Sequence, residues 1–176
     1  MNDENNSSLG RGMLVLAFII VLAMTTWFFS DVLNDLRNPN QQLANSMNTD
    51  GLPEVMLQRN RYGHYIASGS INGQAVEYML DTGATDVAIP ATLAEKMNLK
   101  LGPEIRVSTA NGEITARMSR LDRVDLGAIS LRNIKATINP YMDADDEILL
   151  GMSFLKKLEM IQRGDTLILR QYQLDE

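Results

Sequence analysis

An uncharged run near the N-terminus constrains the fold of this chain more than any other feature. Residues 13–29 read MLVLAFIIVLAMTTWFF, seventeen residues without a charged side chain. A helix needs about 20 apolar residues to span a bilayer and tolerates roughly 17 to 25. Trp27, Phe28 and Phe29 gather at one end of the run, where aromatic rings favour the membrane interface. The run predicts a transmembrane anchor over residues 13–33, preceded by an N-terminal tail, 1–12.

Two other interpretations of this run compete with the anchor. A cleaved signal peptide has an apolar region of about 7 to 15 residues that ends in a small-x-small site. The residues SDVL at 30–33 form a poor site of that kind, and AMT at 23–25 lies inside the run. A buried core helix is the other alternative, but nothing else before Gly51 would cover it. The sequence therefore favours an uncleaved anchor.

A polar stretch separates the anchor from the rest of the chain. Residues 34–54 are rich in Asn, Gln and Asp and contain two prolines. Such a composition is typical of a linker, although a short helical continuation of the anchor to about Leu36 is expected. The predicted organisation is a tail (1–12), an anchor (13–33), a polar linker (34–54) and one domain (55–176).

The domain has the pattern of short strands and tight turns. Asn72-Gly73 and Asn111-Gly112 are strong hairpin signals, each flanked by alternating apolar residues. Helices are predicted only at 90–97, with Pro90 at its start, and at 153–158, with Ser153 as its N-cap. The pattern predicts an all-β domain, closed or sandwich-like, with one or two short helices. Strands are expected at 65–70, 74–80, 105–109, 113–118, 121–126, 130–138, 148–150 and 166–170.

Composition excludes several kinds of chemistry. The chain has 16 basic and 22 acidic residues, a net charge of −6, which argues against nucleic acid as a partner. Cysteine is absent, so disulfides, thiolate zinc sites and a cysteine nucleophile are excluded. The single histidine, His64, rules out multi-histidine metal sites and leaves little room for a Ser-His triad. The remaining candidates for catalysis are carboxylates, with no metal and no cofactor.

One carboxylate stands in a distinctive setting. Residues 76–90 read VEYMLDTGATDVAIP, so an apolar strand delivers Asp81 into a turn and a second apolar strand leaves it. Gly83 allows the backbone to turn sharply, and Thr82 provides a hydroxyl that can cross-link the turn. Asp-x-Gly is also an ordinary turn sequence, and a three-residue match alone is weak. The catalytic interpretation of Asp81 therefore depends on the surrounding sequence.

Other carboxylates and His64 are weaker candidates. The acidic run DADDE at 143–147 lacks the glycine and spacing of a calcium-binding loop, so a solvated loop is expected. Asp86 follows Asp81 at an odd offset, which on an alternating strand places it on the other face and makes it a poor second acid. His64 is expected to have a structural or surface role.

The sequence around Asp81 resembles the retropepsin-like (retroviral-type) aspartic proteases, and closely the bacterial membrane-tethered branch of clan AA. Four blocks carry the resemblance in order: GHYIASGSING from 63, YMLDTGATDVAIP from 78, VSTANGEITAR from 107 and EILLGMSFLKKL from 147. The resemblance extends from about Gly63 to Leu169. It implies a retropepsin-like acid protease half-barrel that follows the transmembrane helix in the sequence.

The resemblance also implies roles for particular residues. Asp81 would be the catalytic acid, and Thr82 would hydrogen-bond across a two-fold axis. Gly83 would line the substrate channel, and Thr85 would support the turn. The second hairpin would be the flap that covers a substrate, with Ala110, Asn111 and Gly112 at its tip.

The chain carries only one Asp-Thr-Gly, whereas this chemistry needs two carboxylates that share one proton and hold a water. The second Asp81 must therefore come from another copy, and we expect a homodimer. The predicted function is a membrane-anchored aspartic endopeptidase acting on protein or peptide substrates. The alternatives are a non-catalytic binding or dimerisation module with the same fold, and an enzyme that mainly processes itself.

The resemblance suggests a place for this protein in the cell. We expect a single-pass protein of the inner (cytoplasmic) membrane, with the domain on the periplasmic or extracytoplasmic side. Charge bias barely decides the orientation, because Arg11 before the apolar run is balanced by Arg37 after it.

Overall fold

The computed structural model describes residues 3–44, 46–109, 112–142 and 147–172. The chain divides into two compact units, Met1–Leu36 and Arg37–Glu176. The first unit is almost entirely the helix α1 (Asp3–Arg37), and the second contains all the strands.

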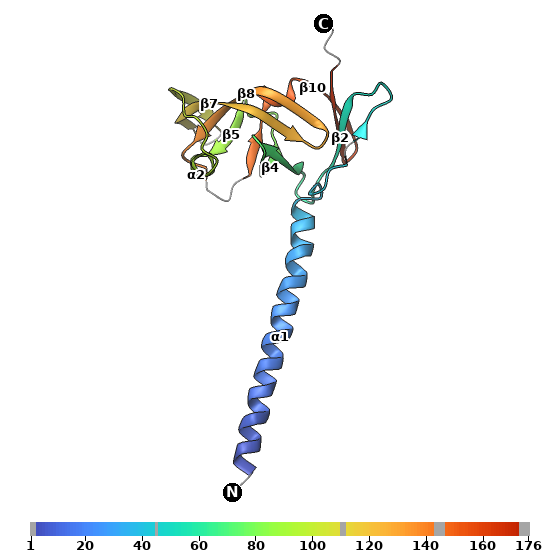
Figure 1. Cartoon of the computed structure of the whole chain (residues 1–176), viewed down its shortest axis with the longest axis vertical. Helices are drawn as coiled ribbons and strands as arrows, with labels where there is room; N and C mark the ends of the chain where they lie inside the picture. The colour runs from blue at the N-terminus through green and yellow to red at the C-terminus, as the bar shows by residue number, and fades with distance from the viewer. Residues whose placement is uncertain (1–2, 45, 110–111, 143–146, 173–176) are drawn as a thin grey trace. The chain divides into compact units, whose positions relative to one another are not determined.

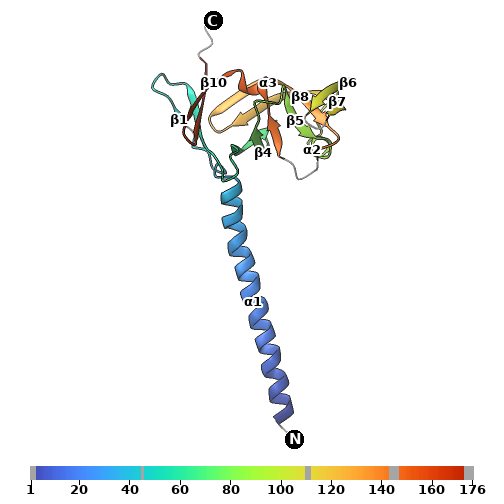
Figure 2. The same ribbon diagram turned by 180° about the vertical axis from the view of Figure 1, so that it is seen from behind.

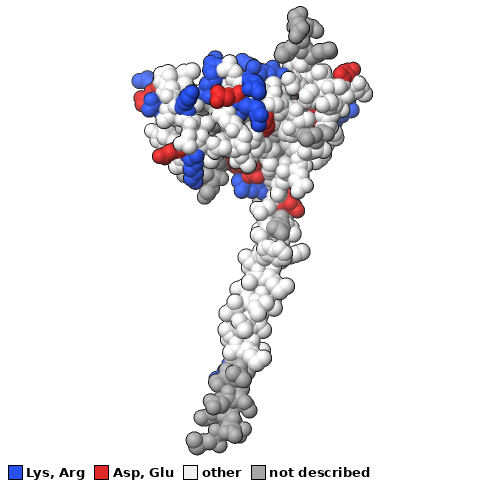
Figure 3. Space-filling model, viewed as in Figure 1, with Lys and Arg blue, Asp and Glu red and all other residues white. Residues whose placement is uncertain are grey.

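Helix α1 contains the apolar run. From Arg11 to Arg37 it is long and apolar enough to cross a membrane, by length and composition. Its surface is uncharged over most of this stretch, as Figure 3 shows. The hydroxyl groups of two threonines in this stretch are hydrogen-bonded within the helix. Thr25 Oγ1 donates to the Val21 carbonyl (2.7 Å), and Thr26 Oγ1 donates to the Leu22 carbonyl (2.8 Å). The predicted continuation of the helix to about Leu36 is confirmed, since α1 ends at Arg37.

The second unit is mostly β. Its elements are β1 (Ser46–Met47), β2 (Pro53–Gln58), β3 (Ile66–Ile71), β4 (Gln74–Leu80), β5 (Val87–Pro90), α2 (Ala91–Lys96), β6 (Glu104–Thr109), β7 (Gly112–Leu126), β8 (Ile129–Asn139), β9 (Ile148–Leu150), α3 (Met152–Leu155), β10 (Leu158–Arg163) and β11 (Thr166–Gln171). All eight predicted strands are present, although two of them, 113–118 and 121–126, are parts of the single strand β7. The predicted all-β class with short helices is confirmed.

The strands form two sheets. The larger has the order β3-β4-β9-β5-β8-β7-β6, and an additional pairing of β3 with β7 closes it on itself. The smaller has the order β1-β2-β11-β10. Figure 1 shows β7 and β8 as a long twisted pair, and Figure 2 shows the same domain from behind, where α3 lies near β8. Alternate side chains of both sheets point into one core, including the fully buried Tyr78, Leu121 and Ile134, and Phe154 of α3 packs into the same core.

The segment after α1 belongs to the folded unit. Asn38 and Asn40 are 2% and 4% exposed, although they fall in the stretch expected to be a linker. The Asn40 amide donates to the carbonyls of Gln58 (2.9 Å) and Ile66 (2.7 Å), and its Oδ1 accepts from the Gln58 N–H (2.7 Å). Asn40 therefore joins β2 of the smaller sheet to β3 of the larger one.

Replacing Asn40 by alanine is expected to destabilise the domain by about 3 kcal/mol or more, because each buried polar group left without a partner costs about 1–3 kcal/mol. For a domain of this size the thermal midpoint should fall by roughly 10 °C. Thermal unfolding of the full chain in detergent checks this. Asn48→Ala is the matched control, since Asn48 bonds within its own loop to Asp50 and Leu52, and it should cost about 1 kcal/mol. Equal losses in the two variants would contradict this role for Asn40.

Candidate active site

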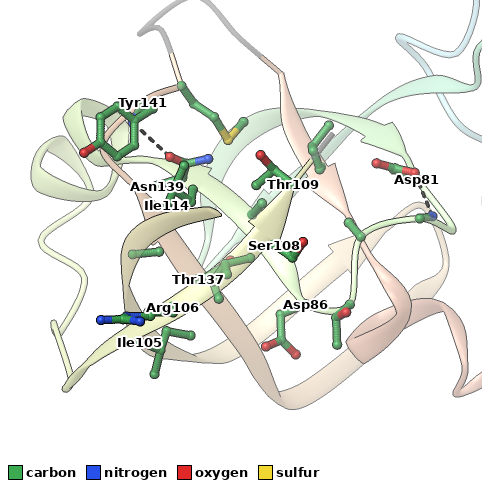
Figure 4. A pocket seen from close by; sticks show the side chains of 18 residues that line it. Asp81, Asp86, Ile105, Arg106, Ser108, Thr109, Ile114, Thr137, Asn139 and Tyr141 are labelled. Atoms are coloured by element: carbon green, nitrogen blue, oxygen red, sulfur yellow. Dashed lines mark hydrogen bonds between the residues drawn. The ribbon is translucent and has the colours of Figure 1, made fainter. Parts of the chain in front are cut away.

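Asp81 lies at the point where β4 ends. Its backbone N–H donates to the carbonyl of Leu150, the last residue of β9 (3.2 Å). Its side-chain Oδ1 accepts the N–H of Gly83 (2.8 Å), as Figure 4 shows. A Cβ at position 83 would lie 3.1 Å from that same oxygen, so glycine leaves the carboxylate uncrowded. The turn thus holds one carboxylate oxygen in place on a rigid strand end.

The turn at 82–86 (the Asp81 turn) is hydrogen-bonded to the start of α3. The N–H groups of Met152 and Ser153 donate to the carbonyls of Ala84 (2.8 Å) and Thr85 (2.9 Å). Gly151 fits directly against the turn, because a Cβ there would lie 2.7 Å from the Ala84 carbonyl oxygen and closer still to that of Asp86. The segment that follows β9 therefore fixes the shape of the Asp81 turn.

Ser153 has a different role from the one predicted. Gly151 is the N-cap of α3, and Ser153 lies inside the helix. Its hydroxyl donates to the Lys135 carbonyl (2.7 Å) and accepts the N–H of Val87 (3.1 Å). The N-cap prediction for Ser153 is wrong because this buried hydroxyl links β8 to the start of β5 instead of closing its own helix.

A cavity of about 840 Å³ opens beside Asp81 (Figure 4). The turn after β4 forms one wall and the β6–β7 hairpin forms another. Its lining includes Asp81, Asp86, Ile105, Ser108, Thr109, Ile114, Thr137, Asn139 and Tyr141. Apolar and polar side chains both contribute to the lining, and Asp81 and Asp86 are its two carboxylates.

The β6–β7 hairpin, which was predicted to be a flap, contributes residues to the wall of the cavity. Its last described pair is Thr109 with Gly112, and Thr109 Oγ1 donates to the Gly112 carbonyl (2.8 Å). Gly112 has a φ of +113°, which favours glycine. Ala110 and Asn111, predicted as the flap tip together with Gly112, lie outside the described residues. The flap role of all three stays a prediction.

Asp86 lines the same cavity as Asp81, contrary to the prediction that it faces the other way. The alternation argument fails because residues 82–86 form a turn and β5 begins only at Val87. In Figure 4 the Asp86 side chain nevertheless lies apart from Asp81 and points in a different direction. Asp86 therefore adds negative charge to the cavity without forming a pair with Asp81.

Tyr78 anchors the strand that carries Asp81. Its buried hydroxyl donates to the Ser70 carbonyl (2.7 Å), and burial, followed by the nearby Asp125 charge, raises the pKa of Tyr78. Burial also acts to raise the pKa of Asp125, but hydrogen bonds from Ser130 and Ser70 and the Arg123 guanidinium outweigh it and lower that pKa. These groups link β3, β4 and β7 to one another.

Three sequence candidates remain: Thr82 in the turn after Asp81, His64, and the acidic run at 143–147. Thr82 is exposed, and His64 is exposed just before β3. Most of the acidic run at 143–147 falls outside the described residues. Within the described part of the chain, no group of three or more acidic or histidine side chains could hold a metal ion.

The structure adds residues that the sequence pattern did not single out. Gly151 was visible only as part of the block EILLGMSFLKKL, and its contact with the Asp81 turn has no local signal. Ser153 was expected only as a helix cap, and nothing in the sequence pointed to its contact with that turn. The segment 37–40 has no signal either, because polar residues at a domain boundary look like a linker.

Comparison with known proteins identifies the family. The model of the family described as gag-polyprotein putative aspartyl protease matches residues 67–157, which is more than half of the chain. The chain is 39% identical over 126 residues to an uncharacterized protein encoded in the cobV 5′ region of a Sinorhizobium species, covering 69% of this chain and 54% of that protein. It is 30% identical over 122 residues to an uncharacterized protein of Rickettsia prowazekii, covering 68% of this chain and 52% of that protein. The chain thus spans about half the length of these curated relatives.

The fold has a counterpart among solved structures. A retropepsin-like aspartic protease from Rickettsia conorii superposes with a TM-score of 0.54 at 29% identity, covering 74% of this chain and 95% of that one. The retropepsin-like fold expected from the sequence is therefore confirmed. The matched residues include Asp81, the β6–β7 hairpin and Gly151. On this match, the chain belongs to the gag-polyprotein putative aspartyl protease family, with a retropepsin-like fold.

Proposed function

We propose that this protein is an aspartic endopeptidase that hydrolyses peptide bonds with a dyad made of Asp81 from two chains. The observation that carries the proposal is the placement of Asp81. Its carboxylate sits at a strand end, is held through Oδ1 by the Gly83 N–H, and opens on a cavity walled by the β6–β7 hairpin. Since Asp86 points elsewhere in that cavity, the second carboxylate comes from another copy.

The chemistry follows from two carboxylates that share one proton. The ionised carboxylate takes a proton from a water held between the pair, and the water oxygen attacks the scissile carbonyl carbon. The protonated partner gives its proton to the carbonyl oxygen. The C–N bond then breaks: one carboxyl group gives its proton to the leaving nitrogen, and the other takes a proton from a hydroxyl of the tetrahedral intermediate, which regenerates the shared-proton pair. Thr82 would bond across the two-fold axis, Gly83 and the flap residues Ala110, Asn111 and Gly112 would contact substrate, and Thr85 would support the turn.

The apolar helix suggests where the enzyme works. We propose that residues 13–33 anchor the domain as a single pass in the inner membrane, with the domain on the extracytoplasmic side. Anchoring confines the copies to one plane and raises their effective concentration, which favours a weak dimer. Because the chain has no cysteine, a single cysteine introduced into the domain and labelled from outside intact cells reports the side.

The test is hydrolysis of an unfolded protein by the full chain in detergent micelles at roughly pH 4 to 6, where a carboxylate pair can hold one proton. Specific activity should rise with the number of chains per micelle and reach a plateau when sedimentation shows a dimer. A fully active monomer would overturn the shared dyad. A dimer without activity on any unfolded protein would favour the non-catalytic module, and cleavage confined to its own chain would favour self-processing.

A further inference from the structure

Arg37, the residue at the end of α1, holds two carboxylates at once. Its Nε and Nη2 both donate to Glu147 Oε1, at 3.0 and 2.6 Å. The same Nη2 lies 3.4 Å from Glu77 Oε2. All three residues belong to the compact unit that starts at Arg37. One guanidinium therefore bridges both carboxylates.

The two acids belong to the strands that frame the Asp81 turn. Glu77 is on β4, which ends just before Asp81. Glu147 immediately precedes β9, which ends just before Gly151. The two strands run parallel, with Tyr78 opposite Ile148 and Leu80 opposite Leu150. Arg37 thus joins the two strands just before their paired stretch begins at Tyr78 and Ile148, while the Asp81 N–H bond to the Leu150 carbonyl joins them at their ends.

Arg37 is itself fixed in position by its neighbours. Its backbone carbonyl accepts the Asn60 side-chain amide (2.9 Å). The next residue, Asn38, is 2% exposed and donates from its amide to Glu77 Oε1 (2.7 Å). The guanidinium is therefore presented to both carboxylates by a segment that is part of the domain framework.

Removing the Arg37 guanidinium would leave two carboxylates close together on neighbouring strands without a positive charge between them. The side chains of Glu77 and Glu147 are only 33% and 16% exposed, so water screens them poorly. Like charges on neighbouring strands repel, and a partly buried charge without its partner is costly. A displacement of β4 against β9 would be passed to their C-terminal ends, where the Asp81 N–H bonds the Leu150 carbonyl and Gly151 packs against the 82–86 turn.

We propose that Arg37 is a positioning residue of the active site, which keeps β4 and β9 in register so that Asp81 is aimed correctly. This inference rests on the proposed protease function. It carries a consequence for self-processing: a cut that separates residue 37 from the domain removes the cation and lowers activity. Release of the domain from the membrane by such a cut would then lower its peptidase activity.

The test compares full-chain variants in detergent, with kcat expressed per active site titrated with a tight-binding transition-state analogue. R37Q should lower kcat about 10- to 100-fold, as small misplacements of catalytic groups do, while KM stays within about threefold. The triple variant R37Q/E77Q/E147Q, in which no charges are left to repel, should recover kcat to within about threefold of wild type. Hydrogen exchange should be faster in the peptide 76–90 of R37Q and normal in the triple variant.

Arg170 provides the matched control. It also joins two carboxylates, Glu54 at 2.7 Å and Glu159 at 3.1 Å, but these lie on β2 and β10 of the smaller sheet. R170Q should leave kcat per site and exchange of 76–90 unchanged. The inference would be overturned if R37Q and R170Q had equal effects, or if R37Q kept the wild-type kcat and hydrogen exchange. A triple variant that stays impaired or fails to fold would also overturn it. Equal activity of wild type and D81N would instead overturn the proposed function, and hydrogen exchange would still decide the role of Arg37.

Discussion

Asparagine in place of Asp81 is expected to lower peptide hydrolysis by about 10³-fold or more, since general acid–base catalysis by a placed side chain contributes about 10²–10⁴-fold and both halves of the dyad are lost. The amide keeps the shape of the carboxylate and still offers an oxygen to the Gly83 N–H, so thermal unfolding should not change. Initial rates on an unfolded protein, with the melting temperature of each sample, measure both. Asp165→Asn is the control, because Asp165 also precedes a threonine but lies in the β10–β11 turn.

Mixing the two chains makes the shared dyad testable. When wild-type and D81N chains exchange freely, only dimers with two wild-type chains contain a complete pair. Equal parts should then give about a quarter of the wild-type activity, whereas independently active chains would give about half. Activity that follows the wild-type fraction linearly would exclude a dyad built from two copies. Full activity of D81N alone would exclude Asp81 as the catalytic acid.

The parts of this site that the sequence predicts are those whose interacting residues are close together in the sequence. The strand before Asp81, its Gly83 turn and the β6–β7 hairpin are local, so alternation and Asn-Gly signals predict them. The half-site argument needs only the count of Asp-Thr-Gly motifs. The buried roles of Asn38 and Asn40 depend on partners from Gln58 to Glu77, and such distant pairing leaves no local pattern.

Two errors have a common physical cause. Asp86 was expected on the opposite face because strand periodicity was extended through a turn, where successive side chains no longer alternate. Ser153 was expected to cap a helix because serine favours that place, but a tertiary partner, the Lys135 carbonyl, takes its hydroxyl. In both cases the chain bends tightly around the Asp81 turn, and tertiary contacts there override local preference.

Gly151→Ala is expected to damage both the stability of the domain and the activity of the site. Its φ of −87° suits any residue, so the requirement for glycine is steric. An added methyl would press on the Ala84 and Asp86 carbonyls, which are backbone and cannot rotate away. We expect a loss of about 3 kcal/mol in unfolding free energy, at the upper end for overpacking. Displacement of the turn should also lower kcat about 10²-fold, as measured per folded molecule.

Gly102→Ala separates this effect from a general intolerance of larger residues. A Cβ at position 102 would lie 3.0 Å from the Met118 carbonyl, a single contact that a small shift of the chain can relieve. It should therefore cost less stability than Gly151→Ala and leave kcat per folded molecule near that of wild type. If Gly151→Ala unfolds at the wild-type temperature and cleaves at the wild-type rate, the start of α3 does not hold the Asp81 turn. A loss of stability without a loss of kcat would show that the contact supports the fold and not the aim of the carboxylate.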